Sequence, residues 1–102
     1  MSYDVWVTEK NWHSDSFNHT SNCGGMWHKA LGIELRRLQG MKTQDAIPIL
    51  INGITEMIAN PAVYKEMNPE NGWGDYESAR EYLQKLLTLC QKYPDGIMGM
   101  SS

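Results

Sequence analysis

The sequence predicts a small α+β domain, mostly helical, with about three helices and a short two-stranded sheet formed by the chain ends. Residues 3–8 have the period of a β-strand, with Tyr3, Val5 and Val7 on one face, and are rich in β-forming residues. Two later stretches, 45–58 and 76–93, repeat apolar residues every three or four positions, which is typical of amphipathic helices. A short apolar tail, 97–100, follows the last helix, and we expect it to pair with the first strand.

The length, composition and net charge of the chain indicate one domain over residues 1–102 and argue against several functions. A chain of 102 residues can bury one hydrophobic core but not two. Its 41% hydrophobic and 21% charged residues are typical of a globular protein. A net charge of −3 without a large Lys/Arg cluster argues against binding to nucleic acid. No apolar run approaches the ~18 residues of a membrane span, and no secretory signal is evident, so we expect a soluble cytoplasmic protein.

A long polar loop is expected between the first strand and the first helix. Residues 9–22 are mostly polar and lack periodicity, although two large aromatic side chains indicate that the loop packs on the body. Its end, 18–25, reads Asn-His-Thr-Ser-Asn-Cys-Gly-Gly. A helix containing Trp27 follows, and we expect Gly32 to end or bend it.

The second helix has two candidate N-caps, Thr43 and Asp45. With Asp45 as the cap, Pro48 falls in the first turn, where its missing N–H costs little stability. With Thr43 as the cap, Pro48 removes one hydrogen bond of the helix. Gly53 in the middle of the helix indicates close contact with another helix. Asn60-Pro61 is expected to end this helix, and a short turn follows.

The third helix is preceded by a loop with an unusual composition. Residues 68–76 read Asn-Pro-Glu-Asn-Gly-Trp-Gly-Asp-Tyr. Gly72 and Gly74 flank Trp73, and glycine is favoured where the backbone takes a positive φ. Asp75 is the expected N-cap of the helix. The loop is therefore expected to have a defined shape.

Two polar loops that each precede a helix N-terminus are the predicted binding site. Free N–H groups and the positive end of the helix dipole favour an anion at such places. Asn and Thr side chains would hydrogen-bond the ligand, and a tryptophan would stack on a base. We expect a small anionic or nucleotide-like ligand and no metal or cofactor. The candidate residues are Asn18, His19, Thr20, Asn22, Trp27, Asn71, Trp73 and Asp75.

Three alternatives stay open beside the ligand-binding interpretation. The two loops can be independent helix caps, with Trp73 docking its loop on the core. The chain can be a protein-interaction module that inhibits another protein through exposed Trp and Met residues. The weakest alternative is a hydrolase. It would use Cys23 with His19 or His28, because a cysteine at a helix N-terminus should have a lowered pKa, or loop carboxylates such as Glu70 and Asp75. The spacing of His19, Cys23 and His28 matches no usual zinc pattern, and binding is favoured over catalysis.

Several tracts resemble a family of small, largely uncharacterised proteins from bacteriophages and bacteria. They include the opening Ser-Tyr-Asp-Val, the N-x-T-x-N tract at 18–22 and the C-terminal motif N-P-E-N-G-W-G-D-Y-E at 68–77. The family typically has a tyrosine where this chain has His19, and Gly24-Gly25 also depart from its pattern. The resemblance implies no activity, but it implies a phage-type protein in a host cytoplasm. There it would sequester an immune signalling molecule or bind a defence protein, as a homo-oligomer if two copies build the pocket.

Overall fold

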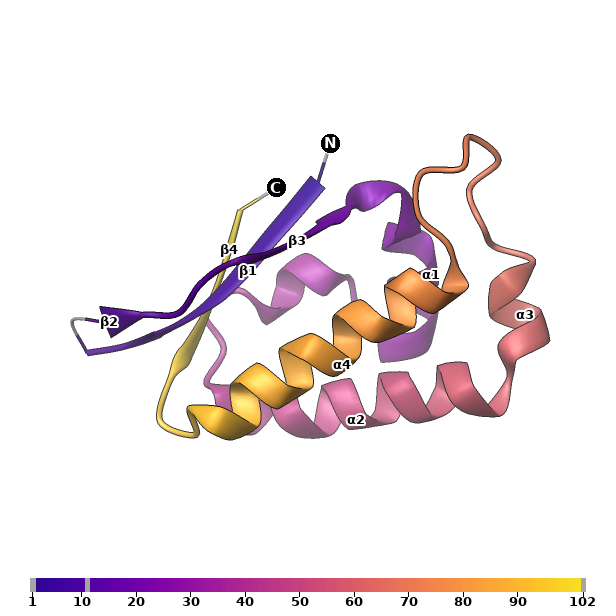
Figure 1. The fold of residues 1–102 in the computed structure, drawn as a ribbon. Helices are drawn as coiled ribbons and strands as arrows, with labels where there is room; N and C mark the ends of the chain where they lie inside the picture. Colours follow the sequence, from indigo (N-terminus) through magenta and orange to yellow (C-terminus); the bar gives the residue numbers. More distant parts are fainter. Residues whose placement is uncertain (1, 11, 102) are drawn as a thin grey trace.

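The computed structural model describes residues 2–10 and 12–101, so Met1, Asn11 and Ser102 lie outside it. An antiparallel sheet packs against a layer of helices, which confirms the α+β fold class (Figure 1). Short 3-10 turns lie at Ser21–Cys23 and Leu35–Leu38. The strands and helices are β1 (Ser2–Glu9), β2 (Trp12–His13), β3 (Phe17–Thr20), α1 (Gly24–Leu31), α2 (Thr43–Ala59), α3 (Pro61–Lys65), α4 (Tyr76–Lys92) and β4 (Ile97–Ser101).

β1 is the central strand of the sheet. Val5 pairs with both Phe17 and Met100, so β3 and β4 lie on opposite sides of β1. Thr8 pairs with His13 of β2 and with Ile97 of β4, so β2 and β4 lie on opposite sides of β1. β2 therefore lies on the same side of β1 as β3. The predicted pairing of the two chain ends is therefore confirmed.

The expectation of a two-stranded sheet and a continuous polar loop over 9–22 is wrong. β2 and β3 occupy this stretch, and the buried Ser14 joins them to β1. The Ser14 N–H donates to the Val7 carbonyl at 2.8 Å, and the Val7 N–H donates to Ser14 Oγ at 2.9 Å. Strands of two and four residues are too short to show an alternating pattern, so no periodic signal marks them.

The two edges of the sheet differ. The segment after the second 3-10 turn covers β4: the Gly40 N–H donates to the Met98 carbonyl at 2.8 Å, and the Met98 N–H donates to the Met41 carbonyl at 2.9 Å. Within the described residues no strand pairs with the outer side of β3. The β3 side is thus the open edge of the sheet.

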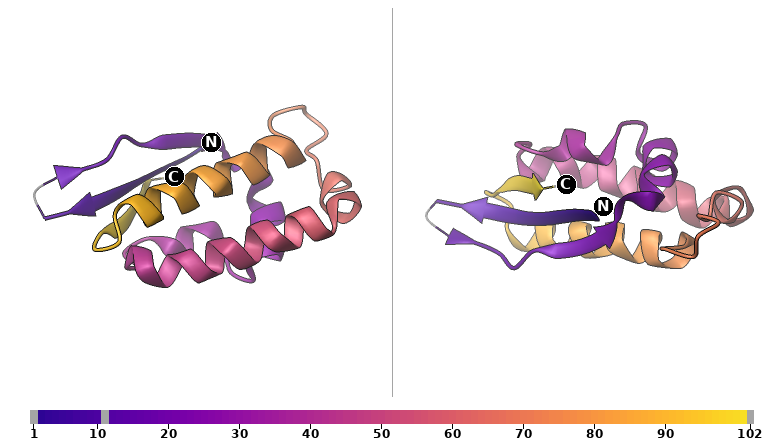
Figure 2. Two further views of the ribbon diagram at one scale, coloured as in Figure 1. Left: turned by 60° about the horizontal axis from the view of Figure 1, so that its bottom comes forward. Right: turned by 90° about the horizontal axis from the view of Figure 1, so that it is seen from above.

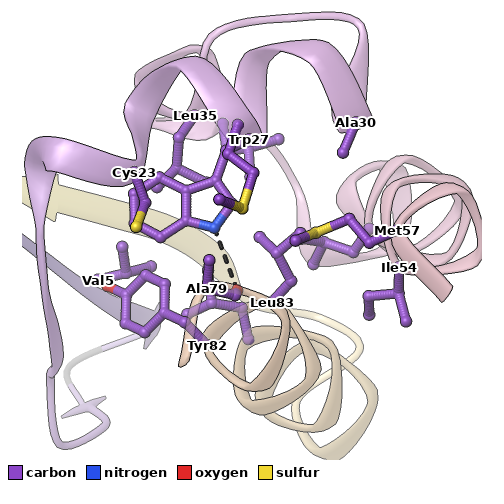
Figure 3. Close-up of a cluster of buried hydrophobic side chains, with 14 of the residues drawn as sticks. Val5, Cys23, Trp27, Ala30, Leu35, Ile54, Met57, Ala79, Tyr82 and Leu83 are labelled. Carbon is purple, nitrogen blue, oxygen red and sulfur yellow. Dashed lines mark hydrogen bonds between the residues drawn. The ribbon is translucent and has the colours of Figure 1, made fainter. Parts of the chain in front are cut away.

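The helices carry most of the core. α2 and α4 lie side by side, and α4 packs against β1 and β3 of the sheet (Figure 2). Val5, Trp27, Met57 and Leu83 come from β1, α1, α2 and α4, and all four are fully buried at their junction (Figure 3). An added Cβ on Gly53 would overlap the Leu31 side chain, which confirms the predicted close helix contact.

Two expectations about α2 and its end need correction. α2 starts at Thr43, after Lys42 as the N-cap, so neither Thr43 nor Asp45 caps it. The Thr43 hydroxyl is buried and donates instead to the Tyr93 carbonyl at 2.7 Å. Pro48 therefore lies inside the helix, where it removes one backbone hydrogen bond. A short helix, α3, replaces the turn expected after Asn60.

The other two main helices follow the sequence pattern. α1 ends at Gly32, which takes a left-handed φ of 81° and donates its N–H to the His28 carbonyl. α4 begins after Asp75 as its N-cap and buries Leu83 and Leu86 on one stripe. In the part of the chain that the structure describes, no helix combines the length and apolar character needed to cross a membrane.

Candidate functional site

The two polar loops predicted to form a site lie against each other. Gly74 packs on the corner between β3 and α1: a Cβ added to it would lie 2.8 Å from Thr20 Cγ2 and 2.9 Å from Cys23 Sγ. His19 Nε2 lies 3.0 Å from Ser78 Oγ in the first turn of α4. Residues more than fifty positions apart in the chain thus form one joint.

This joint is filled by side chains. The His19 ring is 5.0 Å from the Trp27 ring and 5.3 Å from the Tyr82 ring, and its Nδ1 donates to the Thr20 carbonyl at 2.9 Å. Trp27 has no exposed surface, and its indole N–H donates to the Ala79 carbonyl at 3.1 Å (Figure 3). Trp27 is therefore a core residue with no face open to a stacked base.

Most of the candidate polar groups shape the loops. Asn18 Nδ2 donates to Asp4 Oδ1 at 3.0 Å, on the exposed surface. Thr20 Oγ1 accepts from the backbone N–H of the exposed Asn22 at 3.4 Å. Asn71 Oδ1 accepts from the Trp73 N–H at 3.0 Å. The bonds of Thr20 and Asn71 are the turns and caps that Thr and Asn make with nearby backbone, whereas Asn18 links the side chains of the paired strands β3 and β1.

The N-terminus of α4 already holds a carboxylate. Asp75 Oδ1 accepts from the Ser78 N–H at 2.8 Å, and Ser78 Oγ accepts from the Asp75 N–H at 3.1 Å, which completes a capping box. The hydrogen bonds from Ser78 lower the pKa of Asp75, so the group is charged at neutral pH. With the exposed Glu70 and Glu77 nearby in sequence, this end of α4 disfavours an anionic ligand.

Cys23 does not have the lowered pKa that its place before a helix predicted. It is 1% exposed, and burial together with the charge of Asp75 raises its pKa to about 11. Desolvation disfavours the thiolate more than the helix end favours it. At neutral pH Cys23 is a protonated, buried thiol, so the structure gives a hydrolase no activated nucleophile at this position.

Trp73 is the exception among the candidate residues. It is 68% exposed, the most exposed of the large hydrophobic residues that the structure describes. Gly72 and Gly74 on either side have positive φ values of 75° and 89°, so the backbone needs glycine at both places. We call residues 68–75 the Trp73 loop. Its tryptophan does not plug the core, as one interpretation of the sequence expected.

Sequence reasoning missed two residues that hold this loop. Asn68 Oδ1 accepts from the Tyr76 N–H at 2.8 Å, and Ser78 forms the second half of the capping box. Ser78 does not match the usual sequence pattern of a capping box, which has Glu or Gln three positions after the N-cap. No local pattern marks the bond of Asn68 either, since its partner lies eight residues away.

Sequence reasoning also missed a groove between β3 and α4, which we call the β3–α4 groove. Its volume is about 440 Å³, and Phe17 and Leu89 give it apolar walls. Lys85 and Lys92 also line it, and within the described residues neither forms an ion pair. Phe17 was expected in a loop, so the groove was not predictable. The full lining is Phe17, Glu81, Gln84, Lys85, Thr88, Leu89 and Lys92.

Two further tests bear on the class of protein. Among the described residues, no group of three or more His, Cys, Asp or Glu side chains is placed to hold a metal ion. The chain matches no family model, no curated protein and no solved structure. The function is therefore inferred from the geometry of the Trp73 loop and its surroundings.

Proposed function

We propose that this protein is a non-enzymatic interaction module that binds another protein through the Trp73 loop. The observation that supports the proposal is the 68% exposure of Trp73 on a loop whose backbone is fixed by its own hydrogen bonds. Tryptophan is among the residues most enriched where protein interfaces gain most of their affinity.

The Trp73 loop is already ordered in the free protein, which favours its binding to another protein. Gly72 N–H donates to the Pro69 carbonyl at 3.3 Å, Trp73 N–H to Asn71 Oδ1, and Tyr76 N–H to Asn68 Oδ1. The packing of Gly74 on Thr20 and Cys23 fixes the far end of the loop. A segment that is already ordered loses less conformational entropy when it binds, so more of the contact energy appears as affinity.

The same geometry gives less support to a small anionic ligand at the two loops. The Asp75 carboxylate occupies the helix end that would hold the anion, and Trp27 is buried. The polar groups of Asn18, Thr20 and Asn71 already bond within the chain. Ligand binding at these residues stays a prediction, whereas contact through Trp73 requires no rearrangement of them.

Capture from a bacterial lysate tests the proposal. Immobilised wild type is compared with Trp73→Ala and with Trp12→Ala, a matched control that removes another exposed tryptophan, which is 45% exposed and packs on Tyr93. We expect wild type and Trp12→Ala to retain the same protein and Trp73→Ala to lose it. The resemblance to phage proteins suggests a host defence protein as this partner. Equal retention by all three proteins would refute the role of Trp73.

A further inference from the structure

We infer that a second copy of this chain binds the Trp73 loop, with Trp73 of each copy seated in the β3–α4 groove of the other. The inference rests on the proposed function and names its partner. It follows from three features of the described residues: an exposed tryptophan, an apolar groove of suitable size and a charge pattern on α4 that complements itself when two helices lie antiparallel.

The groove is a fitting receptor for an indole ring. Its volume of about 440 Å³ lies within the range of roughly 300–1,000 Å³ that small-molecule pockets span. Phe17 and Leu89 offer apolar and aromatic surface, and aromatic rings gain from offset or edge contacts with each other. The groove also runs beside β3, the open edge of the sheet, so no covering strand or helix blocks access to it.

The exposed face of α4 divides into an acidic half and a basic half. Glu77 and Glu81 lie in the first half, Lys85 and Lys92 in the second, and all four side chains are exposed. At 3.6 residues per turn, positions 77, 81, 85 and 92 fall within one side of the helix. No ion pair within the described chain neutralises these groups. An antiparallel second α4 would place each acidic half beside a basic half.

One register satisfies the tryptophan and the charges together. Within α4, Glu81 is midway between Glu77 and Lys85; Trp73 lies in the loop before α4, whereas the groove is lined by the second half of the helix. A twofold axis passing near Glu81 therefore brings Glu77 to the partner's Lys85 and places the Trp73 loop beside the second half of the partner's α4, where the groove lies. In such an isologous dimer every contact away from the axis occurs twice. The one unfavourable pair is Glu81 with its own copy on the axis, which gives a further test.

Sedimentation equilibrium of the full chain over a wide concentration range tests the inference. We expect a dimer. Trp73→Ala should raise its dissociation constant by ~30-fold or more, as for a hot-spot residue of an interface. Lys29→Glu, a matched charge reversal at an exposed position of α1, should leave the dimer unchanged. A chain that stays monomeric throughout, or a dimer that Trp73→Ala does not weaken, overturns the inference.

Charge exchange tests the register. Glu77→Lys and Lys85→Glu should each weaken the dimer, because each places like charges together twice, and the double variant should recover most of the loss. Glu81→Gln should strengthen the dimer, because it removes a repulsion on the axis. A double variant that is as weak as the single variants overturns the proposed register.

The outcomes also separate this inference from the proposed function. A monomer that still captures another protein from lysate through Trp73 overturns the second-copy inference and supports the interaction module. A Trp73-dependent dimer supports the second-copy inference, and if this dimer retains no protein from lysate, a host protein is excluded as the partner of the Trp73 loop.

Discussion

Gly74→Ala tests whether the two polar loops meet as the structure shows. Gly74 has a φ of 89°, a conformation that costs an alanine ~1–2 kcal/mol. The new methyl group would also lie 2.8 Å from Thr20 Cγ2 and 2.9 Å from Cys23 Sγ. Overpacking of this kind costs ~1–3 kcal/mol, so the variant should lose ~2–5 kcal/mol of unfolding free energy.

Gly72→Ala is the matched control for this prediction. Gly72 has a similar φ of 75°, but an added Cβ would have no atom within 4 Å, so only the backbone cost of ~1–2 kcal/mol applies. Urea denaturation of wild type and both variants measures the two losses, and each 1 kcal/mol should lower the Tm by about 4–8 °C. Equal losses for the two variants would show that Gly74 has no close neighbours and that the loops lie apart.

The other predictions concern single groups in the joint and core. Asp75→Ala should cost ~1 kcal/mol through loss of the cap. Because the folded-state pKa of Asp75 is lowered, its contribution to stability is full above the unfolded pKa of 3.8 and is lost as pH falls through the folded pKa. Urea titrations at several pH values should show that Asp75→Asn weakens this loss of stability in acid. An unchanged pH dependence would contradict the prediction. Cys23 and Cys90 are buried with pKa values raised to about 11, so a thiol reagent at neutral pH should label them only as the chain unfolds; immediate labelling would contradict the buried site. Tyr82→Phe should cost ~1–3 kcal/mol in thermal unfolding, because the buried hydroxyl donates to the Phe17 carbonyl at 2.7 Å; no loss would show that this bond is not formed.

The sequence predicted those elements whose pattern is local and repeated. α4 was predicted because its apolar residues recur over seventeen positions and Asp75 marks its start. β1 was predicted from the alternation of residues 3–8, and its pairing with the tail from the short apolar run 97–100. The start of α2 was misjudged because the buried Thr43 bonds to Tyr93, a residue fifty positions away, instead of capping its own helix.

The parts that the sequence did not predict depend on contacts between distant residues. β3 has four residues and is defined by its register with β1, such as His19 opposite Tyr3. Trp27 had helical spacing that fits a core residue and a binding residue equally, and only packing decides between them. Whether Trp73 is exposed could not be predicted for the same reason, although its two flanking glycines did indicate a loop of defined shape. The β3–α4 groove exists only once β3 lies beside α4.

The most direct test of the central claim is photo-cross-linking from the position of Trp73 itself. A chain with p-benzoylphenylalanine in place of Trp73 is irradiated alone and in bacterial lysate, and the cross-linked peptides are identified by mass spectrometry. A benzophenone at position 12 is the control for an exposed aromatic elsewhere. We predict a cross-link from position 73 to the groove-lining segment 81–92 of a second copy, at twice the mass of the chain. Irradiation that gives no protein cross-link from position 73, alone or in lysate, would contradict the claim that the Trp73 loop is a protein-binding surface.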